Sequence, residues 1–90
     1  MTRNQSIRHE CLLQLYGAGL SIALSPAHIA KVCKREGDDF SKPEIHDALL
    51  FLKGQGFAEV VSDPGTGAQS FRITSAGVIH YETTNPEAGD

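Results

Sequence analysis

The 90-residue sequence predicts one small α+β domain, in which three helices precede a two-stranded hairpin and a short closing helix. Apolar residues recur at helical spacing in three consecutive segments, each with a capping signal or a glycine stop. Two segments of strand-type composition then flank the turn-forming stretch DPGTGAQ. We expect the domain to cover residues 1–82 and a disordered acidic tail to cover residues 83–90.

The first helix is predicted from about Gln5 to Tyr16, before the stop signals Gly17 and Gly19. Its single apolar stripe consists of Ile7, Cys11, Leu12, Leu15 and Tyr16. The segment LSIALS follows, with apolar residues at every second position. That period of two predicts a short strand.

Ser25 and Pro26 open the second helix, because a serine hydroxyl can cap free backbone N–H groups and proline suits the first helical position. Its buried side contains Ile29, Val32 and Cys33, and Gly37 ends it. Its last turns carry three basic residues, Lys31, Lys34 and Arg35. These residues suit two interpretations, a clamp on DNA phosphates or a solvated helix end that the helix dipole stabilises.

The third helix, predicted over residues 42–55, has complete start signals. Ser41 and Glu44 form a capping box, and Phe40 and Ile45 are spaced as a hydrophobic staple. Its buried stripe is Ile45, Ala48, Leu49 and Leu52. The turn GDDF, which separates it from the second helix, has the length expected of a helix-turn-helix.

Leu50 and Phe51 lie outside that stripe, and at about 100° per residue Leu50 points almost directly away from it. One interpretation is an exposed apolar patch for a protein partner, which could be a second copy of the chain. The other is that Phe51 packs beneath the final helix or the hairpin, with Leu50 as a tolerated exposed residue. Beyond this helix, Phe57–Ser62 and Ser70–Thr74 predict the hairpin, and TSAGVIHYE predicts the closing helix.

The order of these elements, with the segments EIHDALLFLKGQGFAEV and FRITSAGVIHYE, resembles the winged helix-turn-helix superfamily over about residues 5–82. The first segment is similar to the third helix running into the first strand of the wing. The second is similar to the exit from the wing into a final helix. The sequence also looks similar to small prophage-encoded winged-helix proteins.

The resemblance implies a small DNA-binding transcriptional regulator, acting as a dimer, with the third helix in the major groove of double-stranded DNA. Carried over by position, the residues facing base edges are Ser41, Lys42, His46 and Asp47. Those near the DNA backbone are Lys31, Lys34, Arg35 and Arg72. The alternative is a protein-interaction module that uses Leu50, Phe51 and the same helix without binding DNA.

The charge balance does not single out either function. Residues 1–74 contain eight basic and eight acidic side chains, so the net charge of −3 comes from Glu82, Glu87 and Asp90. The wing segment SDPGTGAQS has no Lys or Arg, and Glu44 and Asp47 add negative charge to the reading helix.

We expect no cofactor and no metal, because the histidines and cysteines lack ligand spacing and Cys11 and Cys33 fit buried, reduced positions. No catalytic motif appears, so an enzyme is not expected. The sequence has no membrane-spanning segment and no secretion signal, which predicts a cytoplasmic protein.

Overall fold

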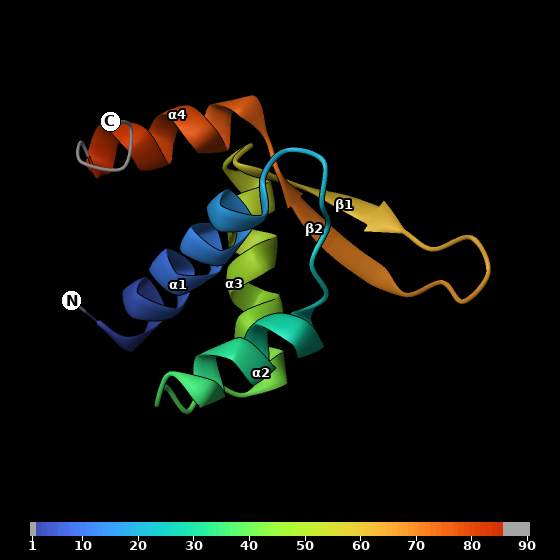
Figure 1. The fold of residues 1–90 in the computed structure, drawn as a ribbon, viewed down its shortest axis with the longest axis horizontal. Helices are drawn as coiled ribbons and strands as arrows, with labels where there is room; N and C mark the ends of the chain where they lie inside the picture. Colours follow the sequence, from blue (N-terminus) through green and yellow to red (C-terminus); the bar gives the residue numbers. More distant parts are fainter. Residues whose placement is uncertain (1, 86–90) are drawn as a thin grey trace.

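The structure, a computed structural model, describes residues 2–85. Three helices, α1 (Arg3–Ala18), α2 (Pro26–Arg35) and α3 (Lys42–Gly54), precede the antiparallel strands β1 (Ala58–Ser62) and β2 (Gln69–Ile73). Helix α4 (Ser75–Thr84) closes the described part of the chain. Figure 1 shows α3 between α1 and α2, with the hairpin projecting to one side as a wing. The predicted element order is confirmed.

One core joins all of these elements. It contains Ile7, Cys11 and Leu15 from α1, Ile29 and Cys33 from α2, the predicted stripe of α3, and Phe71 and Ile73 from β2. Each apolar stripe predicted for the three helices is therefore on the buried side, apart from Tyr16 and Val32, which are partly buried. Cys11 and Cys33 are free and buried, as predicted.

The segment LSIALS forms less strand than predicted. Only Leu24 pairs with the sheet, through two hydrogen bonds of 2.8 Å with the backbone of Phe71. Leu20 and Ile22 are exposed, so the alternation of this segment does not reflect one buried face. The short strand predicted here is a single bridge at the edge of β2.

Helix α1 begins earlier than predicted, because Thr2 and Gln5 form a capping box before the apolar stripe starts. Helix α4 runs to Thr84, two residues past the predicted domain boundary at residue 82. The rest of the predicted tail, residues 86–90, lies outside the described residues. Within residues 2–85, no helix combines the length and apolar character that crossing a membrane requires.

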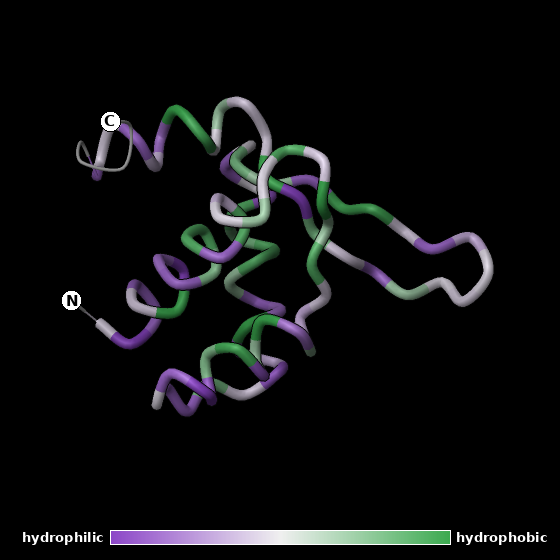
Figure 2. Tube along the Cα trace, viewed as in Figure 1, coloured by the Kyte–Doolittle hydropathy of each residue, from purple (hydrophilic) through white to green (hydrophobic). Residues whose placement is uncertain are grey.

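The wing ends in a tight turn made of its own polar groups. The Gly65 N–H donates to Asp63 Oδ1 at 2.8 Å, and the Gly67 N–H donates to the Asp63 carbonyl at 2.8 Å. Gly67 has a φ of +72°, a conformation that glycine adopts without steric cost. Figure 2 shows no strongly hydrophobic residue at the far end of the wing, in contrast to the middle of α4.

Candidate nucleic-acid interface

The start of α3 is fixed by the predicted capping box. The Glu44 N–H donates to Ser41 Oγ at 3.3 Å, and the Ser41 N–H donates to Glu44 Oε1 at 3.1 Å. Phe40, the predicted staple residue, is partly buried against the core. The N-terminal turn of the candidate reading helix therefore has its free backbone N–H groups capped within the chain.

Arg3 binds the same turn from α1. Its Nε donates to Glu44 Oε2 at 2.7 Å, and its Nη2 donates to Glu44 Oε1 at 3.0 Å and to the Asp39 carbonyl at 2.8 Å. The guanidinium carbon also lies 5.3 Å from the centre of the Phe40 ring. The hydrogen bonds from Arg3 and Ser41 lower the pKa of Glu44 to about 2. Glu44 is therefore ionised, and its charge is offset by a bidentate arginine.

The residues predicted to face DNA bases divide between two sides of α3. Lys42 and His46 border a shallow pocket with Pro26 and Pro43, next to the start of α2. The His46 ring meets Phe71 of β2 edge-on, with ring centres 6.0 Å apart.

Asp47 lies on the opposite side of α3, in a pocket that also contains Asn4 and Arg8 of α1. Ser41 is exposed, but its hydroxyl is engaged in the cap. Lys42 and His46 are therefore grouped, and Asp47 is not part of that group.

The basic residues of α2 all lie on its solvent side, where Lys31, Lys34 and Arg35 are exposed. Lys34 borders a shallow pocket with Gly37, Asp38 and Asp39. The arrangement leaves the three cations accessible to a polyanion, with acidic neighbours at one end. Both interpretations of this cluster are compatible with its position.

Arg72 is paired across the hairpin. Its Nε donates to Glu59 Oε1 at 2.8 Å, and the two residues are Cα partners in the β1–β2 register. Both side chains are partly exposed. Arg72 must leave or share this ion pair before it can contact a phosphate.

Leu50 and Phe51 are 41% and 42% exposed. Phe51 is not a core residue, so the interpretation that it packs into the core beneath the final helix or the hairpin is wrong. The guanidinium group of Arg8 stacks on the Phe51 ring in a cation–π contact, with its central carbon 3.7 Å from the ring centre. Phe51 also borders a groove with Arg8, Leu12, Phe57 and His80, where the Phe57 and His80 rings are stacked 4.2 Å apart.

Arg3 and Arg8 are the candidate residues that the sequence prediction missed. Both come from α1 and lie against the acidic and aromatic side of α3. Arg3 precedes the segment assigned to the first helix, and Arg8 has no local pattern that marks it. No local signal marked either residue, since the partners of Arg3 lie 36 or more positions away and Phe51 lies 43 positions from Arg8.

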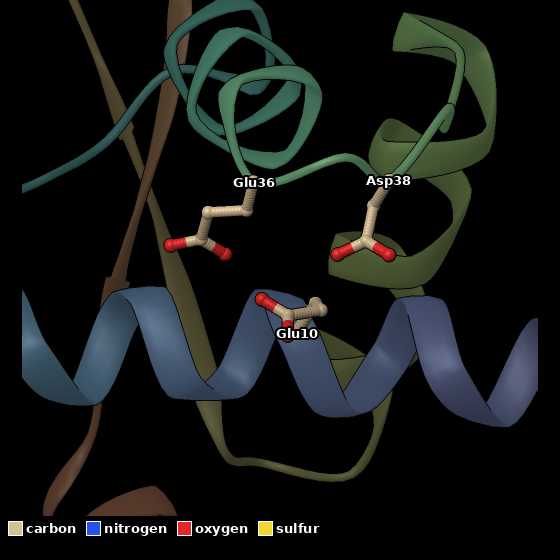
Figure 3. A group of neighbouring side chains, drawn as sticks. All are labelled: Glu10, Glu36 and Asp38. Atoms are coloured by element: carbon tan, nitrogen blue, oxygen red, sulfur yellow. The ribbon is translucent and has the colours of Figure 1, made fainter.

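Three carboxylates gather between α1 and the end of α2, as Figure 3 shows for Glu10, Glu36 and Asp38. One ligand oxygen from each lies within 4.8 Å of the others. Burial, followed by the charges of Glu36 and Asp38, raises the pKa of Glu10. The two cysteine thiols do not join these carboxylates as ionised groups. Burial raises the pKa of Cys11 to about 12 and that of Cys33 to about 11, so both thiols stay protonated.

No protein-family model and no curated protein matches the chain. Solved structures do match. The Helicobacter pylori ferric uptake regulator Fur is 25% identical over 79% of this chain and 47% of its own, with a TM-score of 0.67. MepR of S. aureus, solved in a complex with DNA, is 17% identical over 96% of this chain and 63% of its own, with a TM-score of 0.72.

A transcriptional regulator from Clostridium thermocellum, Cth-833, is 16% identical, with a TM-score of 0.76. That match covers 99% of this chain and 88% of the neighbour. The chain thus spans about half of Fur and less than two thirds of MepR. Together with the helices and the wing described above, these likenesses show that the fold is that of the winged helix-turn-helix superfamily.

Proposed function

We propose that this protein is a small DNA-binding transcriptional regulator that docks α3 in the major groove of double-stranded DNA. The observation that carries the proposal is the state of the α3 N-terminus, where a capped first turn has its one acidic residue paired with Arg3. Glu44 therefore repels an approaching phosphate far less than its sequence position implies. The solved structures that share this fold include a ferric uptake regulator, MepR in complex with DNA and a transcriptional regulator, which supports a regulatory function.

The residues of the proposed interface have different roles in binding DNA. Lys42 and His46, which share one side of α3, lie nearest the base edges together with the exposed Ser41, whereas Asp47 faces α1. Lys31, Lys34 and Arg35 contact phosphates from the exposed side of α2, and these contacts fix position without reading sequence. Arg72 contributes less, because its exposed ion pair with Glu59 competes with phosphate. A dimer on a two-fold site would present two copies of α3.

The experiment is a binding titration with a pool of random-sequence duplex DNA at several salt concentrations. Reversing Lys31, Lys34 and Arg35 to glutamate should abolish binding, because each phosphate contact contributes a slope of about −0.9 in log K against log salt. The matched control exchanges the same residues as Lys31→Arg, Lys34→Arg and Arg35→Lys, which keeps every charge. Circular dichroism checks that α2 survives the reversal, since acidic residues near its C-terminus oppose the helix dipole.

Unchanged affinity in the reversed variant would show that α2 is not the phosphate clamp. Absence of salt-sensitive binding by the wild type, even at low salt, would refute DNA binding altogether.

The second candidate is a protein-interaction module that uses Leu50 and Phe51, and their exposure favours it. Replacing both residues by serine should then abolish self-association or partner capture while the fold persists. The same variant should leave salt-dependent DNA binding by α2 in place if the first proposal is correct.

A further inference from the structure

The outward side of α3 is less polar than its charge count suggests. At about 100° per residue, the positions most nearly opposite the buried stripe are Pro43, Asp47, Leu50 and Gly54. Leu50 has the longest of these four side chains and is 41% exposed, whereas Asp47 lies in the pocket against α1. An apolar group therefore occupies the middle of the helix face that points away from the core.

The acidic side of the same helix is occupied by α1. Arg3 holds Glu44, Arg8 covers part of the Phe51 ring, and Asp47 shares a pocket with Arg8. The basic side, with Lys42 and His46, faces the start of α2 and the wing. Leu50 lies between these two sides, so a duplex docked on α3 would meet it between them.

The chemistry of the major groove gives such a residue one favourable target. Thymine presents a 5-methyl group there beside its O4 acceptor, whereas cytosine presents only a C5 hydrogen beside its N4 donor and the purines present N7 with O6 or N6. A leucine placed against those polar edges would remove their water without replacing its hydrogen bonds. Against the methyl group of thymine, the same leucine gains an apolar contact that none of the other bases offers.

We propose that Leu50 is a specificity-determining residue that selects thymine at one position of each half-site through the 5-methyl group. This inference rests on the proposed DNA-binding function. The DNA site bound by this chain would then require a thymine, in addition to the bases that Lys42 and His46 contact. Replacing the contacted thymine by deoxyuridine should weaken binding about three- to five-fold, which corresponds to burial of roughly one methyl group.

The test begins with selection of duplexes from a random pool by the wild-type protein. Each thymine of the enriched duplex is then replaced singly by deoxyuridine, and affinity is measured by fluorescence anisotropy at fixed salt. We expect one thymine per half-site to give the loss with the wild type. Leu50→Ala should bind the thymine and deoxyuridine duplexes equally.

The matched control is Ile79→Ala, which trims a 64% exposed isoleucine on α4 and should keep the thymine preference. Leu50→Ala is expected to fold, because alanine favours helix and the side chain is not in the core. An enriched duplex that tolerates deoxyuridine at every position, or an equal loss with Leu50→Ala, would overturn this inference and leave the proposed function standing. If no duplex is enriched and no salt-dependent binding is found, both are overturned.

Discussion

Replacing Gly77 by alanine tests how closely α4 must approach the start of the wing. A Cβ atom at this position would overlap the carbonyl oxygen of Phe57 and lie 2.8 Å from Ile73 Cγ1. The Phe57 carbonyl cannot move freely, because it accepts a 3.0 Å hydrogen bond from the Thr74 N–H. Thr74 in turn caps α4 through the Gly77 N–H at 3.1 Å and donates to the Gly56 carbonyl at 2.6 Å.

Relief of the overlap therefore requires α4 to shift away from the hairpin or the Phe57–Thr74 bond to stretch. Overpacking of this kind costs about 1–3 kcal/mol, and contact with a tethered backbone carbonyl places Gly77→Ala in the upper half of that range. For a domain of this size, each kcal/mol changes Tm by about 4–8 °C. We expect a loss of about 8–24 °C, measured by thermal and urea unfolding followed by circular dichroism.

Gly17→Ala in α1 is the matched control, because a Cβ there meets no atom within 4 Å. That substitution should stabilise the protein by about 0.5–1 kcal/mol through helix propensity alone. The two substitutions thus have opposite expected signs. Equal Tm changes for both would refute the close packing of α4 against Phe57.

Two further predictions concern pH. The pKa of Glu44 is lowered from 4.5 to about 2, so its stabilising effect is present above pH 4.5 and is lost as pH falls toward 2. Glu44→Gln should therefore unfold at a lower temperature than the wild type at pH 7, with the difference closing in acid. The pKa of Glu10 is raised above 4.5, so the ionised form weakens the fold at neutral pH and the penalty disappears as pH falls through the raised pKa. Glu10→Gln should therefore be more stable than the wild type at pH 7 and should match it in acid, which thermal unfolding over pH 3–8 would measure.

Local patterns predicted the elements wherever one short segment contains its own signals. The capping box at Ser41 was visible because it is complete within a few residues. The LSIALS segment failed because alternation alone does not specify a partner strand. Only Leu24 pairs with the edge of β2, whereas the side chains of Leu20 and Ile22 are exposed to solvent.

The candidate site was less predictable, because its electrostatics depend on contacts between distant parts of the chain. Glu44 was interpreted as a charge that opposes DNA, and its partner Arg3 is 41 positions away. Phe51 has a large apolar side chain of the kind found in cores, and only the tertiary structure places its ring against Arg8. A helical wheel specifies which way a side chain points but not which other helix lies there.

Ion pairs reduce the apparent conflict between a net charge of −3 and the proposed function. Glu44 and Glu59 are paired with arginines, whereas Glu36 and Asp38 gather with Glu10 of α1 and stay negative beside the end of α2, as Figure 3 shows. Lys31, Lys34, Arg35 and Lys42 remain on exposed surfaces of α2 and α3. Exposed charges act only over about 8–10 Å at physiological salt, so a docked duplex responds to the charges of its own contact face. The salt slope of DNA binding, which counts those contacts, is therefore a better test of this protein than its net charge.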